Sequence, residues 1–422
     1  MTSPDGLIAR RILDVALDRM RDEPVVLLEG PRSVGKSTVL QTIARQLGGQ
    51  VLDLDDIATR EAVLTDPATM VAGPGPVCVD EYQRAPIVLD AIKAELNRSN
   101  RPGRFVLTGS ARHESLPAAA QALTGRLHRM TLYPLSQSEL DGTGVNLLSQ
   151  LFADPSAAVA GTPSTTTREE YTERIARGGF PLALVRSSAP SRHRWFDDYV
   201  RLTLERDVRE LSRVRQARAL PPLLECLAGQ TAQVLNISSA AELTGLDVNT
   251  ARDYIRLLQA VFLIHELPAW GKTLTSRSSA SPKVHVLDSG VATRLLRLTP
   301  EKLIRRDPAS LTEFGHLLET FVVGEVMKDA SWMDGITGLG HWRTYEGHEV
   351  DLVVERDDGA VVGFEVKAAA RAAGDDFRGL RKLRDTMGEA FIAGVVLHTG
   401  ARGYHYEDRL HALPIDRLWT AT

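Results

Sequence analysis

The stretch from Gly30 to Ser37 constrains the fold of this chain more than any other part of its 422-residue sequence. It reads GPRSVGKS and fits the pattern G-x-x-x-x-G-K-[ST] at every fixed position. The apolar run Val25 to Leu28 precedes it, and residues 38–43 after it have the composition of a helix. In this strand–loop–helix setting, curled backbone N–H groups and a helix N-terminus bind phosphate groups. The sequence therefore predicts a nucleoside triphosphate site on a parallel α/β sheet, formed by Gly30, Pro31, Arg32, Ser33, Val34, Gly35, Lys36, Ser37 and Thr38.

Two loop residues and two carboxylates further along carry the predicted chemistry. Lys36 is predicted to reach the terminal phosphates, and the Ser37 hydroxyl to ligate the Mg²⁺ that bridges them. Residues 77–81, VCVDE, read as a buried parallel strand whose carboxyl end carries function. Asp80 would hold Mg²⁺ through water, and Glu81 would orient the water that attacks the γ-phosphate. An isolated Asp-Glu pair is more typical of a solvated turn, but its position downstream of a phosphate loop favours the catalytic interpretation.

Two further polar residues are candidates for the same site. A strand at residues 104–107 ends in Thr-Gly-Ser, so the Ser110 hydroxyl is predicted to sense the γ-phosphate or the attacking water. Arg126 follows a glycine and leads into a strand at residues 127–132. Arg126 is either an arginine finger, for its own or a neighbouring subunit's site, or a salt-bridged surface residue.

Composition and charge exclude several classes of protein. The net charge is −4, so nucleic-acid binding would need a local basic patch rather than a global positive field. The two cysteines, Cys78 and Cys226, lie far apart without metal-ligand spacing, which favours a reducing compartment. Residues 1–20 lack the apolar core of a signal peptide, and no apolar run has membrane-spanning length. We therefore expect a cytoplasmic protein with no membrane partner, and the oligomeric state stays open.

The length of the chain predicts several domains. We assign a phosphate-loop domain, a linker with a helical segment, a winged-helix-like domain and a C-terminal α+β domain to residues 1–140, 141–220, 221–300 and 301–422. Residues 141–167 are rich in Ser, Thr, Ala, Gly and Pro and read as a surface loop. The helical segment after it is rich in arginine, and Arg192-His193-Arg194 is its predicted exposed patch.

Two short helices in the third segment resemble a helix-turn-helix. They are predicted at residues 237–243 and 248–258, and residues 261–267 and 283–287 would supply the strands of a wing. The outward face of the second helix would carry Asn249, Thr250, Arg252 and Arg256. Such a face contacts DNA or docks a protein partner, and both interpretations stay open.

The C-terminal segment contains a predicted β-hairpin with two facing carboxylates. Its strands, residues 349–354 and 361–367, are joined by a favoured three-residue loop with glycine at the left-handed position. Counting back from that loop, Asp351 faces Glu365 at a Cβ separation of about 4.5–5.5 Å. Lys367 shares the face of Glu365 because side chains alternate along a strand.

Facing carboxylates between apolar neighbours repel each other unless a divalent cation neutralises them or one is protonated. Oxygen ligands suit Mg²⁺ or Mn²⁺, so Asp351 and Glu365 are candidate ligands of a metal that activates water for phosphodiester attack. Lys367 would stabilise the developing charge, and Glu319 lies upstream on a helix predicted at residues 312–328. An inactive site and a solvated hairpin face are the alternatives.

Several stretches together resemble bacterial and archaeal AAA-type ATPases that carry a C-terminal DUF4143 region: the phosphate loop, VDEYQ at 79–83, LTGS at 107–110 and LTGR at 123–126. The resemblance spans nearly the whole chain and implies a P-loop NTPase fold of the AAA+ kind that uses ATP. The Asp-x13-Glu-x-Lys spacing of Asp351, Glu365 and Lys367, with Glu319 upstream, resembles the PD-(D/E)XK nuclease superfamily. That resemblance implies a restriction-endonuclease-like C-terminal domain.

These features lead to a principal hypothesis and an alternative. The principal hypothesis is an ATP hydrolase that couples its nucleotide state to the binding of DNA or RNA or to metal-dependent cleavage. The alternative is an ATP-dependent regulatory switch that acts on a protein partner and carries a vestigial nuclease-like domain. The long C-terminal region disfavours a third reading, a small-molecule kinase.

Overall fold

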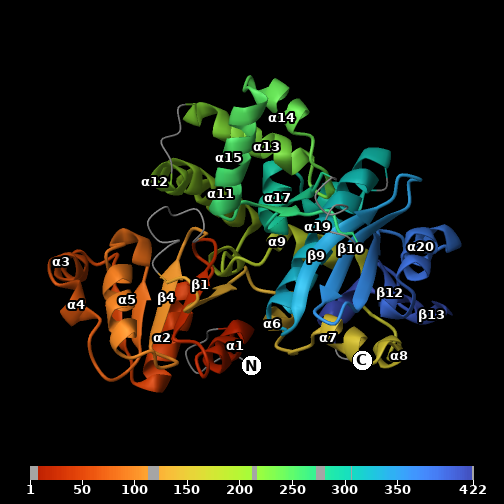
Figure 1. Ribbon diagram of the computed structural model, residues 1–422. Helices are drawn as coiled ribbons and strands as arrows, with labels where there is room; N and C mark the ends of the chain where they lie inside the picture. The colour runs from red at the N-terminus through yellow and green to blue at the C-terminus, as the bar shows by residue number, and fades with distance from the viewer. Residues whose placement is uncertain (1–7, 113–122, 212–215, 272–280, 306, 421–422) are drawn as a thin grey trace.

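The computed structural model describes residues 8–112, 123–211, 216–271, 281–305 and 307–420 (Figure 1). Three sheets organise these residues: a five-stranded sheet near the N-terminus, a three-stranded sheet in the middle and a six-stranded sheet near the C-terminus. In Figure 1 the N-terminal sheet lies on the left, most of the middle helices lie above and the C-terminal sheet lies on the right. The predicted α/β class is confirmed.

The N-terminal sheet is parallel, with strand order β2-β3-β4-β1-β5. Its strands are β1 (Val25–Glu29), β2 (Gln50–Asp53), β3 (Val77–Asp80), β4 (Phe105–Gly109) and β5 (Leu127–Thr131). The three central strands are buried along their whole length, as expected for a parallel sheet covered on both faces. Because the strands are parallel, the ends that lead into Gly30, Glu81 and Ser110 meet at one edge of the sheet.

Alternating side chains of β1 divide the core of this part in two. Val26 and Leu28 pack in the cluster that contains α1 (Arg11–Arg19) and α2 (Lys36–Leu47). Val25 and Leu27 pack in the opposite cluster, which contains residues of α3 (Ile57–Thr65), α5 (Val88–Arg98) and the 3-10 turn η1 (Tyr82–Arg84); α4 (Pro67–Met70) packs against α3 and α5.

The middle of the chain is mostly helical. Its helices are α6 (Gln137–Asp141), α9 (Arg168–Arg177), α10 (Pro181–Leu184), α11 (Ala189–Leu202), α12 (Val208–Leu211), α13 (Leu220–Gly229), α14 (Ile237–Thr244), α15 (Val248–Ala260), α17 (Ser289–Leu295) and α18 (Pro300–Ile304). A π-helical segment, Thr203–Asp207, joins α11 to α12. Antiparallel strands β6 (Gln233–Val234), β8 (Lys283–Val286) and β7 (Ile264–Leu267) form the small sheet. The helix pair and both strands predicted for a wing are therefore present.

The C-terminal sheet is mixed, with strand order β13-β14-β12-β11-β10-β9. Its strands are β9 (Ile336–Arg343), β10 (Glu349–Arg356), β11 (Val361–Lys367), β12 (Phe391–His398), β13 (Tyr404–Glu407) and β14 (Leu410–Pro414). Helix α19 (Pro308–Ser331) packs on one face and α20 (Arg378–Met387) on the other. The hairpin register is confirmed, because Leu352 pairs with Phe364, one position inside Asp351 and Glu365.

The prediction of a surface loop over residues 141–167 is wrong for its central part. Helices α7 (Leu147–Ala153) and α8 (Pro155–Val159) form there, capped by the side chains of Asn146 and Asp154. The leucines of α7 are buried, and this helix packs against α19 and β12. Short capped helices have too few turns to produce the periodic pattern on which the prediction relied.

Among the described residues, no helix combines the length and apolarity needed to cross a membrane.

Candidate functional site

The phosphate loop leaves the carboxyl end of β1 and enters α2. A Cβ on Gly30, which has φ +157°, would lie 2.2 Å from the carbonyl oxygen of Leu132, so only glycine fits there. Gly35 caps α2 with φ +97°, a left-handed conformation that glycine adopts without strain. The two glycines turn the loop onto the N-terminus of a 12-residue helix, a setting that favours a bound anion.

Lys36 begins α2 and points back across the loop. Its Nζ donates to the carbonyl oxygens of Gly30 and Pro31, each at 2.9 Å. Burial lowers the pKa of Lys36 to about 8, an effect that Glu81 opposes and Arg32 reinforces. Lys36 is therefore mainly protonated at pH 7, and a phosphate beside it would favour the charged form further.

Asp80 ends β3 and accepts hydrogen bonds from the hydroxyls of Ser37 and Thr108. Burial raises the pKa of Asp80, and these two hydrogen bonds oppose the shift. The strand order explains the contact, because β4, which carries Thr108, lies between β1 and β3. The adjacent hydroxyl of Ser37 and carboxylate of Asp80 fit Mg²⁺, which prefers oxygen ligands.

Glu81 follows β3 in a left-handed backbone conformation, φ +53°, which is uncommon for a residue with a Cβ. Its backbone N–H donates to Thr108 Oγ1 at 3.0 Å, and its carboxylate accepts a hydrogen bond from Ser110 Oγ at 3.0 Å. Gln83 donates to the same carboxylate and, at 3.0 Å, to Ser110 Oγ. The structure brings Glu81 and Ser110 together and adds Thr108 and Gln83, which the sequence analysis quoted without assigning them roles. Their position at strand tips beside the phosphate loop was the available signal.

Arg126 lies away from this site within its own chain. It precedes β5, whose first residue pairs with Val25 at the beginning of β1, whereas the phosphate loop follows the end of β1. Its Nη1 donates to Asn97 Oδ1 at 2.7 Å in an exposed position. A role for Arg126 at its own nucleotide site is therefore not supported by its placement.

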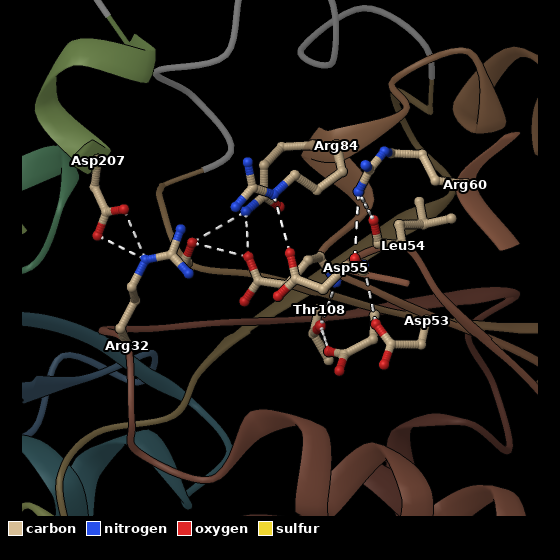
Figure 2. A network of polar contacts seen from close by, with 12 residues as sticks. Arg32, Asp53, Leu54, Asp55, Arg60, Arg84, Thr108 and Asp207 are labelled. Atoms are coloured by element: carbon tan, nitrogen blue, oxygen red, sulfur yellow. Dashed lines mark hydrogen bonds and ion pairs between the residues drawn. The ribbon is translucent and has the colours of Figure 1, made fainter. Parts of the chain in front are cut away.

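Other arginines lie at the carboxyl edge of the sheet (Figure 2). Arg32, in the phosphate loop, pairs with Asp207 at 2.7 Å. Arg84, just after β3, pairs with Asp55 at 3.1 Å, and Arg60 donates to the carbonyl oxygen of Leu54 at 2.8 Å.

The predicted C-terminal site residues also lie close together. Asp351 Oδ2 accepts a hydrogen bond from the backbone N–H of Val366 at 2.9 Å, which ties it to β11. Lys367 Nζ lies 2.7 Å from Glu365 Oε1, so this lysine places a positive charge directly beside the facing carboxyl group. Asp351 and Glu365 are the residues that the sequence analysis gives as candidate metal ligands, with an inactive site and a solvated hairpin face as the alternatives.

The sequence analysis missed a second lysine in this cluster. Lys283, on β8 of the middle sheet, places its Nζ 2.8 Å from Glu319, 2.9 Å from Glu349 and 3.0 Å from Asp351. The Lys283 side chain is only 3% exposed. Its ammonium group therefore occupies the position that a cation between these carboxylates would take.

The charges of the cluster balance through lysines and retained protons. Burial alone would lower the pKa of Lys283, but Asp351, Glu319 and Glu349 together raise it, so it stays charged. Burial, reinforced by Asp351, raises the pKa of Glu319 and raises that of Glu365 to about 8. In the described part of the chain, no group of three or more His, Cys, Asp or Glu side chains is arranged to hold a metal ion. With Lys283 in place, the residues do not fit a divalent metal here.

Two arginines that the sequence analysis placed on exposed faces, Arg192 and Arg256, are paired with acidic residues. Arg192 is buried and pairs with Glu173 at 3.3 Å, so the prediction of an exposed patch is wrong at that residue. On the exposed face of α15, Arg252 donates to Asn249 at 3.1 Å and Arg256 pairs with an aspartate at 3.1 Å.

Comparison with known proteins divides the chain into three matched regions. Residues 22–141 match a family model described as "AAA domain". Residues 168–302 and 314–418 match two domains of unknown function, DUF8612 and DUF4143.

Relatives and solved structures resemble the chain at low identity. The uncharacterized proteins Mb2031c of Mycobacterium bovis and Rv2008c of Mycobacterium tuberculosis are each 26% identical over 419 residues, covering 98% of this chain and 85% of theirs. The structure of the Walker-type ATPase PABY2304 of Pyrococcus abyssi covers 70% of this chain and 97% of its own, with 14% identity and a TM-score of 0.43. The chain carries an AAA domain match over its N-terminal parallel sheet, followed by regions that match DUF8612 and DUF4143.

Proposed function

We propose that this chain binds ATP together with Mg²⁺ and hydrolyses it. The observation that carries the proposal is the meeting of Lys36, Asp80 and Glu81 at one edge of the parallel sheet, beside a loop that opens onto a helix N-terminus. Lys36 binds the terminal phosphates, while Ser37 and Asp80 would hold Mg²⁺. When bound, that ion neutralises charge on the phosphate oxygens.

The hydrolytic step needs an oriented water and a base. The water oxygen forms a bond to the γ-phosphorus while the bond from this phosphorus to the β,γ-bridging oxygen breaks, which yields ADP and inorganic phosphate. Glu81 orients the water and accepts its proton. Ser110 fixes the Glu81 carboxylate through their hydrogen bond at 3.0 Å.

The nucleotide state also has a contact route to the middle of the chain. Arg112 follows shortly after Ser110, and its backbone N–H donates to the carbonyl oxygen of Ala260 at 2.9 Å. Its Nε donates to the carbonyl oxygen of Gln259 at 3.2 Å, and its guanidinium carbon lies 4.9 Å from the ring centroid of Phe262. These contacts join the nucleotide edge to the C-terminal end of α15, which supports a coupled ATPase.

Between the two outputs considered, the Lys283 ammonium favours a switch over cleavage. A nuclease site needs its carboxylates for a metal, and in this chain the Lys283 ammonium contacts three carboxyl groups of the cluster. We therefore propose an ATP-dependent switch that presents the α14–α15 face to a partner, either DNA or RNA or another protein. Supercoiled plasmid incubated with ATP and Mn²⁺ should stay intact, and cleavage that Lys367→Ala abolishes would restore the nuclease hypothesis.

Two substitutions test the ATPase. Lys36→Ala should abolish binding of a fluorescent ATP analogue while the protein still folds, because it removes the cation that faces the phosphates. Glu81→Gln should retain binding and lose phosphate release, because the amide cannot accept the proton of water. The exposed residues Lys93 and Glu61 supply matched controls as Lys93→Ala and Glu61→Gln. Unchanged ATP affinity in Lys36→Ala would contradict the assignment.

A further inference from the structure

The phosphate loop is joined to a residue far away in the sequence. Arg32 Nε donates to both carboxylate oxygens of Asp207, at 2.7 and 2.8 Å, across a separation of 175 residues. The Asp207 side chain is 5% exposed and that of Arg32 is 23% exposed. The ion pair is therefore a contact between the phosphate loop and the middle of the chain, with its carboxylate largely shielded from water.

Asp207 is presented by an unusual piece of backbone. It is the last residue of the π-helical segment between α11 and α12. Single π-helical turns within α-helices are rare and occur frequently at functional sites. Here the segment delivers a carboxylate from the DUF8612 region, residues 168–302, to the phosphate loop of the AAA region.

The loop around Arg32 is held in a strained form. Ser33, the next residue, has φ +64°, a left-handed conformation that costs a residue with a Cβ roughly 1–2 kcal/mol. Such conformations persist where surrounding contacts over-determine them. The Arg32–Asp207 pair on one side, and the Lys36 hydrogen bonds to Gly30 and Pro31 on the other, supply these contacts.

Arg32 also lies within electrostatic reach of the phosphate-binding lysine. Its charge acts to lower the pKa of Lys36, and the charge of Asp207 acts to raise it. A guanidinium group has five donors, and its planar fork suits phosphate oxygens. Nε is the donor that Asp207 engages, which orients the rest of the group. In Figure 2 the Arg32 side chain extends from the loop to Asp207.

We propose that Arg32 contacts the terminal phosphate of ATP from within the same chain, and that Asp207 is the positioning residue that holds its guanidinium group for this contact. The inference rests on the proposed ATPase function. It assigns a role to Arg32 in the AAA region and to Asp207 in the DUF8612 region. Arg32 takes the role that the sequence analysis considered for Arg126. The site is complete only when the DUF8612 region is packed against the AAA region. The rate of ATP hydrolysis therefore depends on the contact between these two regions.

The test compares ATP with ADP. Because Arg32 contacts only the terminal phosphate, Arg32→Ala should keep ADP affinity within about threefold while losing most of the preference for ATP. Its kcat should fall by at least about 100-fold. This loss is smaller than the 10³–10⁵-fold rate increase that arginine fingers provide in phosphoryl transfer. Arg32→Lys keeps the charge without the fork and should recover only part of kcat.

Asp207→Asn should lower kcat with little change in KM, because it acts through Arg32. The double variant Arg32→Ala/Asp207→Asn should then be no slower than Arg32→Ala alone, since two residues that act as a unit are not additive. The matched control is Asp197→Asn, which breaks an exposed bidentate pair with Arg294, also within residues 168–302, and should hydrolyse ATP normally.

Each result decides the matter. Wild-type rates and ATP preference in Arg32→Ala would overturn the inference while leaving the ATPase intact. An additive loss in the double variant, with a lowered unfolding temperature, would reduce Asp207 to a structural residue. If Asp207→Asn fails to fold, the ATP-to-ADP affinity ratio of Arg32→Lys and Arg32→Ala decides the phosphate contact. Failure of the wild type to bind ATP would instead refute the proposed function.

Discussion

Replacing Lys283 with methionine removes the positive charge from the centre of the C-terminal acidic cluster while keeping an unbranched side chain. The lost contacts are the three Nζ–carboxylate distances of 2.8, 2.9 and 3.0 Å. Glu349 is 37% exposed, so water compensates much of its loss. Glu319 and Asp351 are 13% and 10% exposed, and these two carboxylates carry the cost.

The expected loss of unfolding free energy is about 3–5 kcal/mol, the range for leaving a buried charge without its partner. Urea denaturation at pH 7 measures it, with Lys93→Met, on the exposed face of α5, as the matched control. The loss should shrink as the pH is lowered, because protonated carboxyls need no counter-charge. If Lys283→Met alone does not fold, adding Glu319→Gln and Asp351→Asn should restore folding.

Manganese separates the Lys283 account from the metal site predicted at Asp351 and Glu365. If the ammonium fills the cation position, Mn²⁺ should raise the unfolding temperature of Lys283→Met and leave that of the wild type unchanged. Two outcomes would refute the reasoning: a Lys283→Met protein within about 1 kcal/mol of wild type, well below the expected cost, or a wild type that Mn²⁺ stabilises unless Asp351 is replaced.

Three further predictions concern pH and charge. The pKa of Lys36 is lowered to about 8 without nucleotide, and a bound phosphate raises it. ATP affinity should therefore fall by up to tenfold per pH unit above about pH 8. The Lys36→Arg variant should bind ATP with little pH dependence, and isothermal titration calorimetry measures both affinities. Because burial raises the pKa of Glu365 from 4.5 to about 8, its protonated form stabilises the fold at low pH, and this contribution is lost as the pH rises toward 8; Glu365→Gln should flatten the decline in urea denaturation. If α15 contacts nucleic-acid phosphates, Arg252→Ala with Arg256→Ala should lower the salt dependence of duplex binding by about one unit per arginine in log–log slope, and unaltered binding would assign the face to a protein partner.

The sequence predicted features whose cause is local. The phosphate loop depends on Gly30 and Gly35 reaching backbone conformations that other residues avoid, and on a strand before and a helix after it. The edge formed by Asp80 and Glu81 follows from a short apolar strand in a parallel sheet. The pairing of the C-terminal hairpin follows from its loop length and the two-residue period of strands. Each of these rests on a few consecutive residues.

The tertiary structure decided which charges meet. Lys283 reaches Glu319 and Asp351 across 36 and 68 positions, and Arg32 reaches Asp207 across 175. No local sequence pattern identifies these charged residues as buried. The same residue types occur at exposed and at buried positions, and only the residues packed around them differ. Arg126 is the opposite case. The stretch 123–126 belongs to the resemblance to AAA-type ATPases, but the direction of β5 places Arg126 at the end of the sheet opposite the phosphate loop. The conformation of the backbone depends on short stretches of consecutive residues. The partner of a buried charge depends on how whole domains pack against each other.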